Sequence, residues 1–302
     1  METQSSPLRQ NQINIVLHDK RVTPTSNNKK AVNPFQPIDD AFADFVGLKQ
    51  FKENIKEVYA NVQINLQREK AGLKTKKQVL HMLFKGNPGT GKTTVARQLA
   101  ELFHDLNMLS KGHFIEAERA DLVGEYIGQT ANKTRELVEK ALGGILFIDE
   151  AYSLARGGEK DFGKEAIDTL VKQMEDYHQD FILILAGYPH EMDYFLSTNP
   201  GLASRFPMIL DFEDYTVEQL IKIAKQMAQE RDYQLSKEAE WKLTRYLTNE
   251  RNSHHREKFA NARLIRNIIE QTIRKQSMRL MSEHSYSTEQ LMLLIGSDLC
   301  LT

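Results

Sequence analysis

The sequence contains a single cysteine, Cys300, among its 302 residues. One thiol excludes an intramolecular disulfide framework and a zinc site built from cysteines. An excess of one charge is lacking too, because 40 lysines and arginines nearly balance 41 aspartates and glutamates, for a formal net charge of -1. Whole-molecule electrostatics therefore select neither a nucleic acid nor an anionic membrane as the partner.

Long apolar runs are missing as well. The strongly apolar segment 181–186, Phe-Ile-Leu-Ile-Leu-Ala, has the length of a strand, whereas about 20 residues are needed to cross a bilayer. The first seven residues are polar and lack the apolar core of a signal peptide. We therefore expect no membrane span and a cytoplasmic location.

What remains is the composition of a globular protein, with 40% hydrophobic and 27% charged residues. Residues 1–38 are rich in Gln, Asn, Ser, Thr and Pro, which predicts a flexible tail, with a docking arm as the alternative. Residues 39–213 alternate apolar segments with helical patterns, and residues 214–302 are helical throughout. The chain is thus expected to have a tail, a nucleotide-binding α/β domain and a helical lid domain.

The segment 86–93, Gly-Asn-Pro-Gly-Thr-Gly-Lys-Thr, has the pattern of a Walker A phosphate loop (P-loop). It lies between an apolar segment and a helical one, which is the context that such a loop requires. Its glycines let backbone N–H groups curl around phosphate oxygens, and the next helix adds its positive dipole end. Lys92 is expected to reach the β- and γ-phosphates, and Thr93 to ligate Mg²⁺. The residues expected here to bind ATP are Asn87, Pro88, Gly89, Thr90, Gly91, Lys92, Thr93 and Thr94.

The segment 145–150, Ile-Leu-Phe-Ile-Asp-Glu, has the pattern of a Walker B strand. Four consecutive apolar residues predict a strand buried on both faces of a parallel sheet. Two acids then follow at the strand end where ligands bind in open α/β sheets, and adjacent carboxylates there are costly unless they meet a cation. We expect Asp149 to hold Mg²⁺ through water, and Glu150 to orient and deprotonate the attacking water.

Five apolar segments predict strands, near residues 79–84, 113–117, 145–148, 181–186 and 208–212. Helical patterns lie between them, so we expect a three-layer α/β domain with a five-stranded, largely parallel sheet. Further helices are expected at about 216–232, from 236, at about 261–281 and from 287, which predicts a small all-α domain. The first of these begins with a sequence that resembles a capping box, Thr-Val-Glu-Gln.

Two other segments allow more than one interpretation. Val46-Gly47-Leu48 precedes the P-loop strand, where it either packs on adenine or forms an ordinary turn into the next helix. Tyr126 and Ile127 lie between two glycines in a polar loop. They either tuck into the core or belong to a loop that grips a partner.

The combined pattern resembles that of the AAA+ ATPases over roughly residues 39–295. Tyr126-Ile127-Gly128 is similar to the aromatic–hydrophobic–glycine pore loop of the family's substrate translocators. Arg205, in Ser-Arg-Phe, is similar to the arginine finger that completes the ATP site of a neighbouring subunit. The resemblance therefore implies a ring of identical subunits, with a hexamer expected, and a protein substrate in the central pore.

The resemblance also assigns residues around the nucleotide. Arg263, in Asn-Ala-Arg, is similar to the sensor 2 arginine of the helical lid, and Val46-Gly47 falls where the family contacts adenine. One departure is Gly187-Tyr188, which stands where the family commonly has a polar sensor 1 residue, Asn or Thr.

Segments 144–154, 185–188 and 259–263 resemble a subgroup that holds stage V sporulation protein K and the red-type rubisco activases. The expected function is an ATP-hydrolysing ring that remodels or threads a protein, in spore maturation by the nearer resemblance. A rubisco-activase-like remodeller is the alternative within the subgroup. An ATP-dependent nucleic-acid motor and a nucleotide-gated scaffold are the alternatives outside it; no basic, aromatic-interleaved stretch favours the former.

Overall fold

The computed structural model describes residues 33–75, 78–126, 128–157, 161–252, 259–283 and 285–301. Its central sheet has five strands: β1 (Met82–Gly86), β2 (Phe114–Ala117), β3 (Ile145–Ile148), β4 (Ile182–Gly187) and β5 (Met208–Phe212). All neighbouring strands pair in parallel, in the order β2-β3-β4-β1-β5. The predicted five-stranded parallel sheet is therefore confirmed, and β1 lies inside it between β4 and β5.

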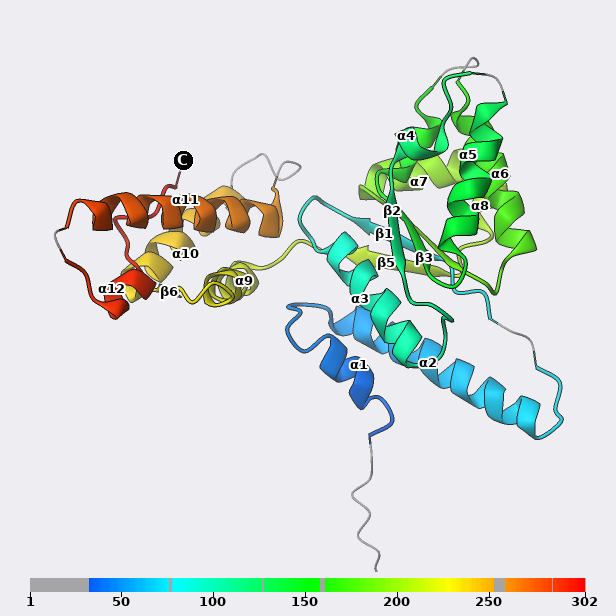
Figure 1. Ribbon diagram of the computed structural model, residues 1–302, viewed down its shortest axis with the longest axis horizontal. Helices are drawn as coiled ribbons and strands as arrows, with labels where there is room; N and C mark the ends of the chain where they lie inside the picture. Colours follow the sequence, from blue (N-terminus) through cyan, green and yellow to red (C-terminus); the bar gives the residue numbers. More distant parts are fainter. Residues whose placement is uncertain are drawn as a thin grey trace, which may run out of the picture. The chain divides into compact units, whose positions relative to one another are not determined.

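Helices cover both faces of this sheet (Figure 1). The alternation of side chains along β1 separates two cores, because Leu83 packs into one cluster while Met82 and Phe84 pack into the other. The second cluster is closed by α1 (Gln36–Ala41), α2 (Lys49–Lys70) and α3 (Lys92–Asp105). The first is closed by α4 (Arg119–Leu122), α5 (Gln129–Ala141), η1 (Ala151–Ala155), α6 (Gly163–Asp176), α7 (Pro189–Thr198) and α8 (Pro200–Ala203).

The helical lid follows β5. It contains α9 (Val217–Gln229), α10 (Lys237–Asn252), α11 (Asn261–Met281) and α12 (Thr288–Met292), with the short parallel pair β6 (Gln234–Leu235) and β7 (Leu293–Leu294). Its apolar stripes form a third cluster, which includes Leu220, Leu243 and Ile265. The predicted capping box is present, since the Thr216 hydroxyl accepts from the backbone N–H of Gln219 at 3.2 Å.

Some elements differ from the sequence prediction. No helix was assigned from the sequence to residues 189–198, which form α7; Pro189 occupies the first helical turn, where its missing N–H costs nothing. The predicted tail ends at residue 38, whereas α1 begins at Gln36 and buries Ile38 completely. Residues 1–32 of that tail lie outside the described part of the chain.

No helix among the described residues combines the length and the apolarity that crossing a bilayer requires.

Candidate active site

The P-loop lies at the C-terminal end of β1 and turns directly into α3, whose first residue is Lys92. Gly89 and Gly91 have φ angles of 73° and 94°, a left-handed backbone that glycine adopts without steric cost. The Thr90 hydroxyl donates to the carbonyl of Asn87 at 2.9 Å and closes the turn. The local sequence therefore builds a loop that ends at a helix N-terminus, the arrangement that binds phosphate groups.

Lys92 is the buried cation of this site, with 9% of the residue exposed. Its ammonium donates to the carbonyls of Gly86 at 2.7 Å and Asn87 at 3.0 Å. Burial lowers the pKa of Lys92 below its ordinary value, while the nearby Asp149 carboxylate acts in the opposite direction. A buried ammonium on a phosphate-binding loop can pair with the negative charge of a triphosphate.

The two acids of the Walker B segment follow β3, whose four residues are all buried. The backbone N–H of Asp149 donates to the carbonyl of Ala117 at 3.1 Å, and its carboxylate accepts from the N–H of Glu150 at 3.0 Å. Glu150 has φ 46° and ψ 43°, a left-handed backbone that is uncommon outside glycine and that clusters at active sites. The acids therefore leave the sheet through a fixed, strained turn.

These elements border one cavity of about 800 Å³, within the range of small-molecule sites. The P-loop and Walker B segments contribute Pro88, Gly89, Gly91, Lys92, Thr93, Thr94, Asp149 and Glu150. The segment before α2 and the lid contribute apolar side chains and three arginines: Phe45, Val46, Ile223, Met227, Ile269, Arg231, Arg263 and Arg266. The cavity thus combines phosphate-binding groups with apolar surface, as a nucleoside triphosphate requires.

The Val46-Gly47 segment joins the lid to the cavity. Val46 is 8% exposed and packs in the lid's apolar cluster. Gly47 has φ 79°, and a Cβ there would lie 2.8 Å from the Gln219 side chain. The side chain of Gln226 donates to the Asp44 carbonyl at 2.9 Å. Val46 lines the cavity, but Gly47, Asn87 and Thr90 are not among the described residues that do so.

The two predicted arginines lie in different places. Arg263, in the first turn of α11, lines the cavity, and its charge acts on Lys92. Arg205 follows α8, pairs with Glu175 of α6 and donates to the Gly201 carbonyl. It is not among the described residues that line the cavity. A single chain therefore brings together Lys92, Asp149, Glu150 and Arg263, but not Arg205.

Several cavity residues were given no role in nucleotide binding on the basis of the sequence. Gly187 and Tyr188, the departure from the family pattern, both line the cavity. Burial, followed by the charge of Glu150, raises the pKa of the Tyr188 phenol. The lid's apolar lining, Ile223 and Met227, was missed because its helical spacing is the same as that of a core stripe.

The loop before α5 exposes Tyr126, 67% of which is accessible to solvent. This exposure excludes the interpretation that Tyr126 packs in the core. The loop is fastened near its start by the Gly124 N–H, which donates to the buried Thr130 hydroxyl at 2.9 Å. It ends at Gly128, whose φ of 83° starts α5. Ile127 lies outside the described residues.

Comparisons with known proteins agree with this geometry. The model of the ATPase family associated with various cellular activities (AAA) matches residues 82–214, and that of the AAA lid domain matches residues 216–301. Stage V sporulation protein K of Bacillus subtilis (strain 168) is 57% identical over 300 residues, which cover 95% of this chain and 93% of that protein.

Two further relatives have other names. Protein CfxQ of Xanthobacter flavus is 48% identical over 236 residues, 78% of this chain and 74% of that protein. The chloroplastic ribulose bisphosphate carboxylase/oxygenase activase of Cyanidioschyzon merolae (strain NIES-3377 / 10D) is 44% identical over 244 residues, 80% of this chain and 82% of that protein. With a P-loop, a Walker B pair, a matching lid and these relatives, the chain belongs to the AAA ATPase family, in the group of stage V sporulation protein K and the CfxQ proteins.

Proposed function

We propose that this ATPase works as a closed ring of identical subunits, a hexamer, that remodels or threads a protein substrate through its pore. The observation that carries the proposal is the exposure of Tyr126 on a fastened loop. Exposure of an aromatic ring to water is unfavourable, and burial of the ring against another chain is favourable. Such rings grip by stacking and apolar contact, which tolerates many substrate sequences.

The cavity residues bind and hydrolyse ATP, and this hydrolysis supplies the energy for remodelling. Lys92 neutralises charge on the β- and γ-phosphates, and Glu150 accepts a proton from the attacking water. Thr93 and Asp149 are the residues that would hold Mg²⁺, and both line the cavity. Bound Mg²⁺ would neutralise charge that develops on the phosphate oxygens. Arg263 reaches the same cavity from the lid, so it links nucleotide state to lid position.

The position of Arg205 supports the ring. An arginine at the γ-phosphate adds on the order of 10³–10⁵ in rate to phosphoryl transfer. Arg205 faces Glu175 rather than the cavity of its own chain. It is therefore available to act on the site of a neighbouring subunit, through a head-to-tail interface that closes by rotation.

The relatives suggest the cellular setting. Identity to stage V sporulation protein K extends over nearly all of both chains and supports a role in spore maturation. The similarity to a ribulose bisphosphate carboxylase/oxygenase activase supports a second candidate, remodelling of that enzyme. A deletion strain that stops late in spore maturation favours the first candidate. Stimulation of ATP turnover by the carboxylase, in the wild-type protein, favours the second.

The test of the mechanism uses Glu150→Gln, which is expected to bind ATP and hold the ring assembled. A photo-crosslinking amino acid at position 126 of this variant should capture a protein chain in the presence of ATP. In the otherwise wild-type protein, Tyr126→Ala should keep ATP turnover within about threefold and lose substrate remodelling, while Tyr126→Phe retains it.

Three results would contradict the proposal. Unimpaired turnover by Glu150→Gln would remove Glu150 as the base. Crosslinks to nucleic acid alone would favour a nucleic-acid motor. A Tyr126→Ala variant that remodels its substrate normally would favour a nucleotide-gated scaffold.

A further inference from the structure

The carboxylate of Asp214 lies in the connector between β5 and α9, and it joins the P-loop to the lid. The side-chain amide of Asn87 donates to both of its oxygens at 3.1 Å. The side-chain amide of Asn261, the first residue of α11, donates to one of them at 2.7 Å. Asp214 therefore accepts from a phosphate-loop residue and from a lid residue at once.

Asn261 is held on every side. It is fully buried, and its φ of 44° is a left-handed backbone that is strained in a residue other than glycine. Its side-chain oxygen accepts from the N–H of Tyr215 at 3.0 Å, and its amide also lies 3.3 Å from the carbonyl of Pro88. Such strain persists only where the surroundings fix the residue.

Backbone contacts continue the same junction. The N–H of Ala262 donates to the carbonyl of Gly89 at 3.1 Å. A Cβ at Gly89 would lie 2.8 Å from the Arg263 nitrogen and nearer still to the Ala260 carbonyl. The hydroxyl of Tyr215 donates to the Thr90 carbonyl at 3.0 Å. The first turn of α11 and the P-loop are thus in main-chain contact, with no space for a side chain between them.

We infer that Asp214 and Asn261 are positioning residues that transmit the conformation of the P-loop to the lid. Arg263 follows Asn261 by two residues and lines the cavity, so the bonds that fix Asn261 also fix where Arg263 enters it. A displacement of the main chain at Asn87 passes through the Asp214 carboxylate to α11. The inference does not depend on what the ATPase acts on, since it concerns nucleotide binding and lid position alone.

The charge of Asp214 distinguishes this junction from a hinge that is held by neutral hydrogen bonds alone. Hydrogen bonds to charged groups are roughly twice as strong as neutral ones. In Asp214→Asn one oxygen becomes an N–H₂ donor, which meets the donor amide of either Asn87 or Asn261. The substitution therefore removes the charge and one acceptor of the bridge without changing the size of the side chain.

The experiment uses the single tryptophan, Trp241, which lies in α10 of the lid. Energy transfer from Trp241 to a bound methylanthraniloyl nucleotide reports lid position, and the titration gives the affinity. In the Glu150→Gln background, transfer at saturation is expected to differ between the ATP and ADP forms. Asp214→Asn should reduce this difference at least threefold while both dissociation constants stay within about threefold. In otherwise wild-type protein, kcat should fall about tenfold with KM nearly constant, the loss of one charged hydrogen bond.

The matched control is Asp211→Asn, the same change on an exposed carboxylate of β5 that lies 3.7 Å from Lys85. A second variant, Asn261→Gly, removes the side-chain bonds while keeping the left-handed backbone unstrained, and it should match Asp214→Asn.

Three outcomes would overturn the inference. The first is an Asp214→Asn variant that resembles Asp211→Asn in both transfer and kcat. The second is a loss of nucleotide affinity in step with kcat, which would make Asp214 part of the binding site itself. The third is equal transfer for both nucleotides in the reference protein, because then no lid displacement would exist to transmit. If Asp214→Asn does not fold, Asn261→Gly decides by the same criteria.

Discussion

The two ends of α11 carry buried polar networks that differ in how far apart their members lie in the sequence. At the N-terminal end, Asn261 bonds to Asp214, and Asp214 to Asn87, which lies 127 residues earlier in the chain. We call this set, with Lys92 on the Asn87 carbonyl, the cavity network. At the other end, Arg279 binds Asp298 through two bonds of 2.9 and 3.0 Å.

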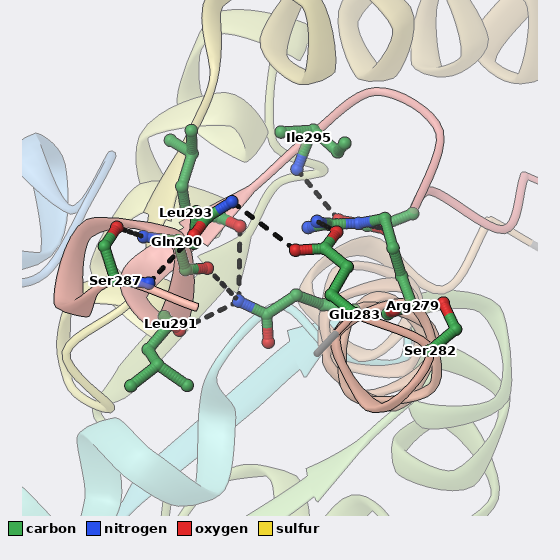
Figure 2. A network of polar contacts seen from close by, with 10 residues as sticks. Arg279, Ser282, Glu283, Ser287, Gln290, Leu291, Leu293 and Ile295 are labelled. Atoms are coloured by element: carbon green, nitrogen blue, oxygen red, sulfur yellow. Dashed lines mark hydrogen bonds and ion pairs between the residues drawn. The ribbon is translucent and has the colours of Figure 1, made fainter. Parts of the chain in front are cut away.

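This second set, the lid-end network, stays within the last 30 or so residues of the chain (Figure 2). The amide of Gln276 donates to the carbonyls of Gln290, Leu291 and Leu293, and the N–H of Ile295 donates to Asp298. Asp298 is only 2% exposed. Together, Gln276 and Asp298 satisfy backbone groups that the short α12 and β7 leave open.

The two networks therefore use buried polar groups for different purposes. The lid-end network ties neighbouring segments together and has no member among the described lining residues of the cavity. The cavity network spans distant segments, includes a strained residue and borders the nucleotide cavity. We therefore expect changes in the cavity network to alter nucleotide chemistry, and changes in the lid-end network to alter stability.

The largest effect is expected from Lys92→Ala. Loss of a buried ammonium that pairs with phosphate should weaken ATP binding at least about 100-fold. Because burial lowers the Lys92 pKa, the folded protein stabilises the charged form less well than water does. Removing that charge should therefore leave the free energy of unfolding unchanged or slightly higher. Nucleotide titration and urea unfolding measure the two quantities.

Lys85→Ala is the control for that variant. Lys85 lies in β1, the strand that leads into the P-loop, pairs with Asp193 at 3.0 Å and is not among the described cavity residues. Its replacement should keep ATP affinity within threefold. Tight ATP binding by Lys92→Ala would contradict the assignment of the P-loop. It would also mean that Lys92, a member of the cavity network, does not affect nucleotide binding.

The sequence predicts well the elements whose signals are local. The P-loop glycines, the four apolar residues of β3 and the stripe of α11 each carry their own pattern, and α11 spans the expected 261–281. Local patterns are also why the helical lid is recognisable. Helix α7 was missed because Pro189 signals a break as readily as a helix start.

Sequence reasoning cannot find contacts that have no local pattern. Asp214 and Asn261 lie 47 residues apart, and nothing in either segment points to the other. Asn261 is a partial exception, since Asn is among the residues that tolerate a left-handed backbone. The exposure of Tyr126 also needed the fold, because an aromatic residue between polar ones fits either a core or a gripping loop.

An intermediate effect is expected from Asp298→Ala. The variant leaves the Arg279 guanidinium and the Ile295 N–H without their partner. Since Arg279 is 26% exposed, water offsets part of the loss, and the free energy of unfolding should fall by about 2 kcal/mol. Urea unfolding followed by Trp241 fluorescence measures it. ATP affinity and kcat should change less than twofold; a larger change in either would break the separation between the networks.

Glu283→Ala is the matched change within the same network. Its contact to Arg279 is 3.4 Å long, and the glutamate side chain is 34% exposed. Partly exposed pairs of this kind contribute about 0.5 kcal/mol or less. An equal loss in Glu283→Ala and Asp298→Ala would mean that burial does not decide stability at this end of the lid.

The smallest effects give the sharpest comparison, because the lid contains the same capping box twice. Thr216 and Ser287 each accept from the N–H three residues on at 3.2 Å, and each donates its own N–H to a Gln side chain at 2.8 Å. Replacing either by Ala should lower the free energy of unfolding by about 1 kcal/mol. Thr216, however, follows Tyr215 of the junction with the P-loop, whereas Ser287 starts α12. Only Thr216→Ala should therefore also reduce the difference in Trp241 energy transfer between ATP and ADP. Equal transfer changes in both variants would mean that general lid stability, rather than the cavity network, sets the position of the lid.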